Sequence, residues 1–175
     1  MIDTIKTTVH NFATWLVGLV GLGEEFANYV YILFISMLPV IELRGALPVA
    51  FAIDLPLIPS FLVSVIGNLI PVPFILWLIT PFCNWLKRTR MFSWFPAFLE
   101  RKVDSKKEKV TKYANWGLFL FVAIPLPGTG AWTGALIASF LDFKFKDALI
   151  AITFGVLTAG IIMSAVSYGL LGLIF

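Results

Sequence analysis

The sequence predicts an all-α integral membrane protein. The mean hydropathy is +0.94, and only 13% of the 175 residues are charged, about half the share usual in soluble proteins. Charge-free stretches lie between Asp54 and Lys87, between Lys112 and Asp142, and after Asp147. Each is longer than the ~20 apolar residues that a helix needs to cross a bilayer. A soluble fold has no use for so much continuous apolar surface.

The first expected element is an amphipathic helix over residues 2–19. Apolar residues recur there at three- and four-residue steps, and polar residues occupy the other side. This pattern favours a helix that lies in the membrane interface. A short transmembrane pass is the alternative, because residues 12–22 carry no charge.

A broken helix should follow. Proline lacks the N–H for a helical hydrogen bond and disfavours helix in the residue before it. An apolar helix should therefore enter from Phe26, break near Pro39, restart around Leu43 and run to about Ile53. Each arm has ~10–13 residues and a length of ~15–20 Å, too short for a ~30 Å hydrocarbon core. The sequence thus predicts a re-entrant hairpin.

The break contains two charges, Glu42 and Arg44, and no other charge lies between Glu25 and Asp54. An ionised side chain inside a bilayer costs ~2.5–3.5 kcal/mol on insertion scales, so such residues are usually kept for function. One hypothesis is that the two residues form a structural ion pair. They would face each other on an extended stretch but not on a helix.

Residues 59–81 form the first expected full span. Pro71 and Pro73 should kink it. Asn68 lies within it and is most often a helix–helix hydrogen-bonding residue, with ligand binding as the alternative.

Residues 84–116 form a basic connection that should lie in the cytoplasm. They contain nine of the thirteen basic residues, and short basic connections stay on the cytoplasmic side of a membrane. Interleaved aromatic residues indicate contact with the membrane surface. This positive-inside pattern explains the charge without nucleic acid, which we exclude as a partner.

The second apolar stretch, residues 116–140, should break at residues 125–130. A polar turn is expected over residues 142–147 and a last span over residues 148–175. Small residues at four-residue spacing, Ala151, Gly155 and Ala159, would let another helix approach closely.

The two halves resemble each other. Leu-Pro, Gly-Ala-Leu and a closing Phe recur in residues 38–51 and 126–140 with one insertion. Each half contains an amphipathic segment, a re-entrant broken helix and a full transmembrane helix. A hairpin plus one span crosses the membrane an odd number of times, so consecutive copies must be inverted. We expect one membrane domain over residues 1–175, with repeat 1 at about 1–83 and repeat 2 at about 117–175.

A polar site near the midplane should lie between the two hairpins. Helix N-termini favour anions, Arg44 can grip a phosphate through a bidentate fork, and burial disfavours the charged form of Glu42, which makes it the candidate proton carrier. The expected substrate or ion-binding residues are Glu42, Arg44, Gly45, Pro39, Pro48, Asn68, Pro125, Pro127, Gly128, Thr129, Gly130, Trp132 and Thr133.

Catalysis, cofactors and metal binding are not expected. His10 and Cys83 are the only His and Cys residues, and we find no metal-ligand cluster and no Gly-x-Ser-x-Gly elbow.

The run Pro39-Val40-Ile41-Glu42-Leu43-Arg44-Gly45-Ala46-Leu47-Pro48, together with residues 125–135, resembles the family of small multi-drug export proteins, which is similar to the wider DedA membrane-protein group. The resemblance covers most of the chain. For the DedA group it implies paired re-entrant helices, an inverted repeat, translocation of polyprenyl phosphate or phospholipid, and proton coupling. The second break departs from that group, since it has no acid and no arginine.

Two further function classes stay open. A proton-coupled exporter of small lipophilic cations would use Glu42 as its exchangeable charge, with Trp132, Tyr29 and Tyr31 as aromatic walls. A membrane assembly protein would transport nothing. We expect an integral, multi-pass protein of a prokaryotic cell membrane, in contact with membrane lipids, with a homo-oligomer as a possible assembly.

Overall fold

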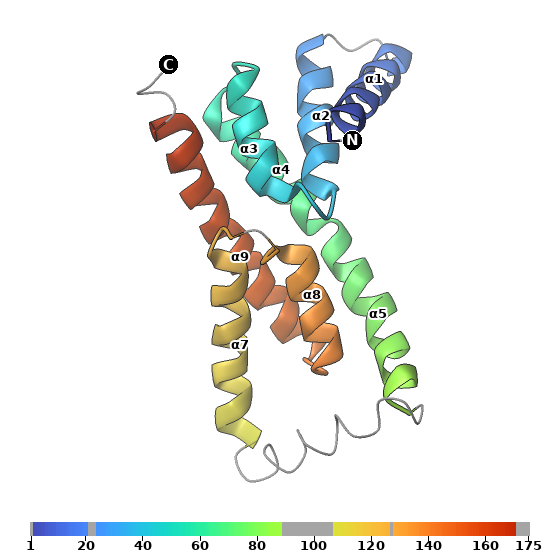
Figure 1. The fold of residues 1–175 in the computed structure, drawn as a ribbon, viewed down its shortest axis with the longest axis vertical. Coiled ribbons are helices and arrows are strands. Elements are labelled where there is room, and N and C mark those ends of the chain that lie inside the picture. Colours follow the sequence, from blue (N-terminus) through green and yellow to red (C-terminus); the bar gives the residue numbers. More distant parts are fainter. Residues whose placement is uncertain (1, 21–23, 89–106, 127, 171–175) are drawn as a thin grey trace. The chain divides into compact units, whose positions relative to one another are not determined.

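The computed structural model describes residues 2–20, 24–88, 107–126 and 128–170. These residues form helices joined by short connections and contain no strand. The helices are α1 (Ile2–Val20), α2 (Glu24–Met37), α3 (Glu42–Ala52), α4 (Leu57–Leu69), α5 (Pro71–Arg88), α7 (Lys107–Ala123), α8 (Ala131–Phe140) and α9 (Phe145–Ser164), followed by the π-helix η1 (Ala165–Leu170) (Figure 1). The all-α prediction is confirmed.

The chain folds as two compact units. Unit 1 consists of Met1–Pro71 and Val156–Phe175, and unit 2 consists of Val72–Gly155. The motif with Glu42 and Arg44 therefore belongs to unit 1, and the second break at residues 125–130 belongs to unit 2.

In unit 1, α2 and α3 form a helical hairpin. The helix stops at Met37 and restarts at Glu42, which confirms the predicted break at Pro39. Figure 1 shows the turn at one end of this pair, with the start of α2 and the end of α3 at the other end. Apolar side chains fill the space between the two helices and α1, and the buried ones are Ala13, Tyr31, Ile32, Ile35, Ala46, Ala50 and Leu55.

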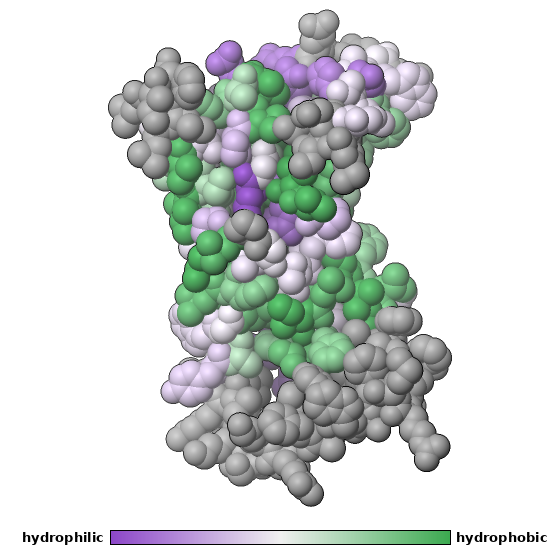
Figure 2. Space-filling model, in the orientation of Figure 1, coloured by the Kyte–Doolittle hydropathy of each residue, from purple (hydrophilic) through white to green (hydrophobic). Residues whose placement is uncertain are grey.

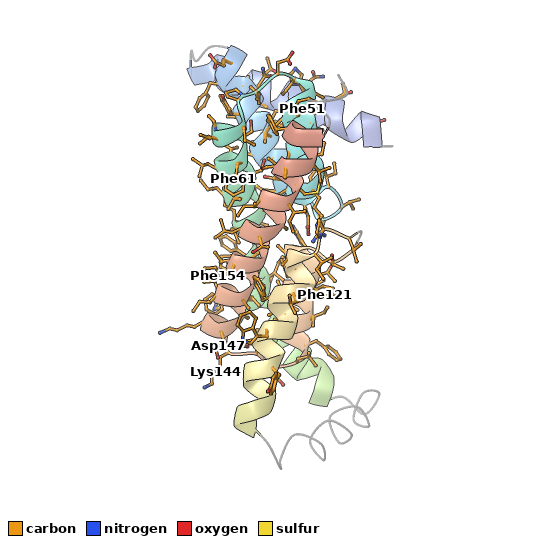
Figure 3. All side chains as sticks on the ribbon, turned by 90° about the vertical axis from the view of Figure 1, so that its left-hand side faces the viewer. Phe51, Phe61, Phe121, Lys144, Asp147 and Phe154 are labelled. Atoms are coloured by element: carbon orange, nitrogen blue, oxygen red, sulfur yellow. The ribbon has the colours of Figure 1, made fainter. Side chains whose placement is uncertain are left out.

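Two contacts fix the rest of unit 1. Gly67 of α4 lies against α2, where a Cβ atom would collide with the hydroxyl of Ser36. At the other end, the Tyr168 hydroxyl of η1 donates a hydrogen bond to the Leu55 carbonyl at 2.9 Å. The Tyr168 ring also lies 5.3 Å from that of Phe51, which Figure 3 labels near the end of α3.

In unit 2, α7 and α8 form a second helical hairpin, and this confirms the predicted break at residues 125–130. Figure 1 shows the start of α7 and the end of α8 at the opposite end from their turn. Gly134 of α8 lies against Val122 of α7 and Ile152 of α9. Gly155 of α9 also lies against Val122, so this small residue admits a close helix as expected.

The two hairpins end in the same way. After α3, the N–H of Asp54 bonds to the Phe51 carbonyl and the N–H of Leu55 bonds to the Ala50 carbonyl. After α8, the N–H of Asp142 bonds to the Ser139 carbonyl and the N–H of Phe143 bonds to the Ala138 carbonyl. Asp54 and Asp142 both have φ 56°. Each helix thus ends in a Schellman motif with an aspartate in the left-handed position.

The helices that follow the two hairpins, α4 and α9, cross the preceding helices in a similar way. Gly67 lies against Ser36 and the Leu33 carbonyl, and Gly155, 88 positions later, lies against Val122 and the Phe119 carbonyl. The partner residues are themselves 86 positions apart in both pairs. A close crossing through glycine is therefore repeated at equivalent positions in the two units.

Among the described residues, the helical stretches Leu57–Ile79 and Phe145–Gly169 are long and apolar enough to cross a membrane. In the first, Pro71 and Pro73 cannot donate helical hydrogen bonds, and α4 gives way to α5 at Ile70, where the sequence predicted a kink. In the second, α9 begins at Phe145, so Asp147 belongs to its first turn rather than to the predicted polar turn. A carboxylate is favourable at a helix N-terminus, and Figure 3 shows Lys144 and Asp147 there.

The helix α4 carries its apolar side chains outward. Ile58, Leu62 and Ile66 are exposed, whereas Ser60, Ser64 and Asn68 are buried. Figure 2 shows large hydrophobic areas on the visible face of the described residues. Polar residues inside and apolar residues outside are the arrangement expected where the solvent is lipid.

Candidate functional site

The turn between α2 and α3 brings the first charge of the motif into the protein interior. Pro39 and Val40 are exposed, and the chain then turns inward at Glu42, which is only 4% exposed. The N–H of Glu42 donates to the Leu38 carbonyl at 2.9 Å. The φ angle of Glu42 is 51°, a left-handed conformation that side chains other than glycine and asparagine rarely adopt. Such strain is typical of functional positions.

Glu42 and Arg44 form an ion pair at the start of α3. The Arg44 Nη1 atom lies 3.8 Å from the Glu42 Oε2 atom, and the two side chains are 15% and 5% exposed. We expected such a pair only on an extended stretch, and that expectation was wrong. The left-handed backbone of Glu42 removes it from the regular helical path, so the helical rule for residues two apart does not apply to it.

Gly45 and Pro48 shape the helix that carries this pair. A Cβ atom on Gly45 would collide with the Ile41 side chain, while the N–H of Gly45 bonds to the Ile41 carbonyl at 3.0 Å. Glycine therefore lets the turn fold tightly onto α3. Pro48 lies inside α3 and, without an N–H, cannot donate to the carbonyl of Arg44. Both residues support the site through the backbone.

Asn68 lies in unit 1 on the buried face of α4. It is 0% exposed, and neither its amide nitrogen nor its amide oxygen has a hydrogen-bond partner among the described residues. The helix–helix hydrogen bond that we considered its most frequent role is thus not formed within this part of the chain. Buried amides are nearly always hydrogen-bonded, so Asn68 remains a candidate ligand-binding residue.

The second break, in unit 2, is built by local hydrogen bonds. The Thr129 Oγ1 atom lies 2.8 Å from the Ile124 carbonyl oxygen and 2.9 Å from that of Leu126, so its single O–H is shared between the two and stabilises the turn. Gly128 has φ 83°, which requires glycine. Pro125 precedes this turn and is partly exposed, and Pro127 lies outside the described residues.

The start of α8 follows this turn. Gly130 is its N-cap residue, in an extended conformation and without a side-chain cap. Trp132 and Thr133 lie in the first turn of α8 and are partly exposed. The N-cap residue of α3, Ile41, also provides no side-chain cap. Neither helix start is therefore closed by a capping side chain of the type that serine or aspartate supplies.

The predicted site residues fall into two groups. Pro39, Glu42, Arg44, Gly45, Pro48 and Asn68 belong to unit 1, and Pro125, Gly128, Thr129, Gly130, Trp132 and Thr133 belong to unit 2. Among the described residues, no group of three or more His, Cys, Asp or Glu could hold a metal ion.

Sequence reasoning missed Ser64 and Ser167. Both are 0% exposed, and neither hydroxyl has a hydrogen-bond partner among the described residues. The signal was present for Ser64, because Ser60, Ser64 and Asn68 recur at four-residue steps and so share one face of a helix.

A family model described as "Putative small multi-drug export protein" matches residues 42–162. The match begins at Glu42, the first residue of α3, and includes the second break at residues 125–130. No curated protein and no solved structure matched the chain.

Proposed function

The chain belongs to the family of putative small multi-drug export proteins, and we propose that it is a membrane transporter whose cargo is an anionic lipid phosphate, either a polyprenyl phosphate or a phospholipid. The observation that carries this proposal is the burial of Arg44 beside the start of α3. An exporter family and two membrane-capable helices support the transport class, and the charges at the site support the choice of cargo.

The sign of the charge favours an anion. The guanidinium of Arg44 and the positive end of the α3 dipole both attract negative charge. Glu42 opposes them only while it is ionised. A guanidinium can also bind two phosphate oxygens in parallel, which a compact ammonium cannot do.

Glu42 is the proposed coupling group. Its side chain is 5% exposed, and a carboxyl group removed from water favours its neutral form. Protonation would remove the single negative charge of the motif and raise the affinity for phosphate. Deprotonation would restore the ion pair with Arg44 and release the cargo.

The membrane arrangement that we propose is an inverted repeat of two re-entrant hairpins. α3 has 11 residues and α8 has 10, so each is roughly 15 Å long, about half the thickness of a bilayer core. The matching helix ends and the matching glycine crossings support a repeat. Residues 84–116 would lie in the cytoplasm of a prokaryotic cell, as their basic charge favours.

A proton-coupled exporter of lipophilic cations is the second candidate, and the printed family name favours it. The position of Tyr31 argues against the aromatic wall that this candidate requires. Tyr31 is buried, and its ring lies 5.1 Å from that of His10. Tyr29 packs against the same core. An aromatic side chain held in a packed core cannot also enclose a cation.

Binding to the purified protein, measured from pH 5 to 8, separates the two candidates. We expect a polyprenyl phosphate to bind, and more tightly at lower pH, because protonated Glu42 no longer repels it. Arg44→Lys should weaken binding by about tenfold, since it loses roughly one charge-assisted hydrogen bond. Lys144→Arg, far from the motif in sequence, is the matched control and should leave binding unchanged.

The cation hypothesis predicts the opposite dependence. A lipophilic cation would bind more tightly as the pH rises and Glu42 ionises, and Arg44→Lys would have no effect. Cation binding without phosphate binding at any pH would overturn the proposed cargo.

A further inference from the structure

The buried face of α4 carries polar groups that the fold does not use. Ser60 satisfies its hydroxyl within its own helix by donating to the Pro56 carbonyl at 2.8 Å. One and two turns further on, the Ser64 hydroxyl and both ends of the Asn68 amide have no hydrogen-bond partner among the described residues. All three residues are 0% exposed. A buried polar group without a partner costs about 1–3 kcal/mol.

The matching crossing of α9 shows that packing does not require these groups. Gly67 and Gly155 occupy equivalent positions 88 residues apart, and the same offset relates Ser64 to Ile152 and Asn68 to Val156. Ser36, which lies against Gly67, likewise matches Val122, which lies against Gly155. The equivalent residues are thus apolar, and Ile152 and Val156 are fully buried. Ser64 and Asn68, which we call the polar layer, therefore occupy positions that apolar residues can fill at the matching crossing.

This layer lies beside the turn that carries Glu42. Gly67 contacts Ser36 in the last turn of α2. Leu38, two residues further, accepts the hydrogen bond from the Glu42 N–H. A Cβ atom on Gly160 of α9 would contact both Leu43 and Phe61, so the first turn of α3 and the part of α4 just before Ser64 lie against the same part of α9. Residues 57–69 contain no ionisable side chain.

The chemistry of the layer indicates water as its ligand. Asn68 presents an unsatisfied donor and an unsatisfied acceptor, and Ser64 presents a group that is both. A cation would satisfy only the oxygens and would leave the amide N–H groups unpaired. Water donates and accepts, and buried waters typically make about three hydrogen bonds to such groups. A lipid headgroup is too large for residues with no exposed surface.

We propose that Ser64 and Asn68 form an internal hydration site in unit 1 that supplies protons to Glu42. The site itself rests on the geometry of α4 and on its difference from α9. Only its role in proton supply rests on the proposed function. Water held by hydroxyl and amide groups can pass protons through a region that lacks ionisable side chains, and this is the role that the site would have beside Glu42.

Radiolytic hydroxyl labelling of the full-length protein in detergent tests the site, because buried waters generate radicals where bulk solvent cannot reach. Val65 is 7% exposed and lies between Ser64 and Asn68. We expect Val65 to be labelled well above Ile152 and Val156, the apolar equivalents in the repeat. Asn68→Val and Ser64→Ile, which introduce those equivalents, should reduce the labelling of Val65 to their level. Ser60→Ala is the control and should leave it unchanged.

Three outcomes would overturn the hydration site. The first is labelling of Val65 no stronger than that of Val156, and the second is labelling of Val65 that persists in Asn68→Val. The third is labelling that requires sodium and is not supported by another cation, which would indicate a bound ion in place of water. Ser64→Thr keeps the hydroxyl and should keep the labelling, so a general loss of folding can be told from a loss of water.

Proton supply is tested separately by transport in proteoliposomes. Ser64→Ile should slow transport of the lipid phosphate, and Ser64→Thr should restore it. Equal transport by Ser64→Ile and the unchanged protein would remove the proton role but leave the hydration site. If labelling behaves as expected and no variant or unchanged protein transports any lipid phosphate, the proposed function is wrong while the site stands.

Discussion

At the scale of single residues, Glu42 combines a left-handed backbone with near-complete burial and an ion pair to a residue two positions away. The left-handed conformation costs a side chain roughly 1–2 kcal/mol. Glycine would avoid this cost but cannot carry a charge. Glutamate at this position therefore keeps a buried carboxyl group at the cost of a strained backbone.

Substitutions at Glu42 can separate the backbone from the charge. Glu42→Gly and Glu42→Ala both remove the carboxyl group, but only glycine tolerates a φ of 51° without strain. We expect Glu42→Gly to be more stable than Glu42→Ala by about 1 kcal/mol, measured by thermal unfolding in detergent. Ala52→Gly, at the far end of the same helix, is the control and should destabilise. A Glu42→Ala variant as stable as Glu42→Gly would contradict a left-handed conformation at this position.

At the scale of helices, the breaks could be predicted from sequence because their cause is local. Pro39 and Pro125 have no backbone N–H to donate, and each disfavours helix in the residue before it. The preceding helices end close to these prolines. The ion pair could not be predicted in its observed form, because it depends on a single backbone angle. The unsatisfied amide of Asn68 could not be predicted either, because it depends on which side chains of α2 and α3 pack against α4. Such long-range packing leaves no local pattern.

The crossing of α4 with α2 depends on Gly67. A Cβ atom there would collide with Ser36 and lie 2.5 Å from the Leu33 carbonyl oxygen, so Gly67→Ala should destabilise the protein by roughly 1–3 kcal/mol. Gly117→Ala is the matched control, because a Cβ atom there would meet nothing within 4 Å. It should stabilise the protein, since alanine is more favourable than glycine in a helix by about 1 kcal/mol. Urea or thermal unfolding in detergent measures both. A neutral Gly67→Ala would mean that α4 does not approach α2 this closely.

At the scale of the whole molecule, two similar units carry different chemistry. Both contain a helical hairpin that ends in a left-handed aspartate, followed by a helix with a glycine crossing. Unit 1 places an acid, an arginine and buried hydroxyl and amide groups around its hairpin, whereas the positions of α9 that match Ser64 and Asn68 are the buried Ile152 and Val156. The similarity between residues 38–51 and 126–140 predicted a helical break in each half, and both breaks are present. The difference between the two crossings depends on which side chains α4 and α9 bury, and that is decided by long-range packing.

Transbilayer movement of a fluorescent polyprenyl phosphate in proteoliposomes tests the central claim most directly. An impermeant reductant added outside reports how much lipid has reached the outer leaflet. We expect movement that is faster with an inward proton gradient, is lost in Glu42→Gln and is strongly reduced in Arg44→Lys, with both variants still folded. Movement equal to that in protein-free liposomes, or a normal rate in Glu42→Gln, would contradict it.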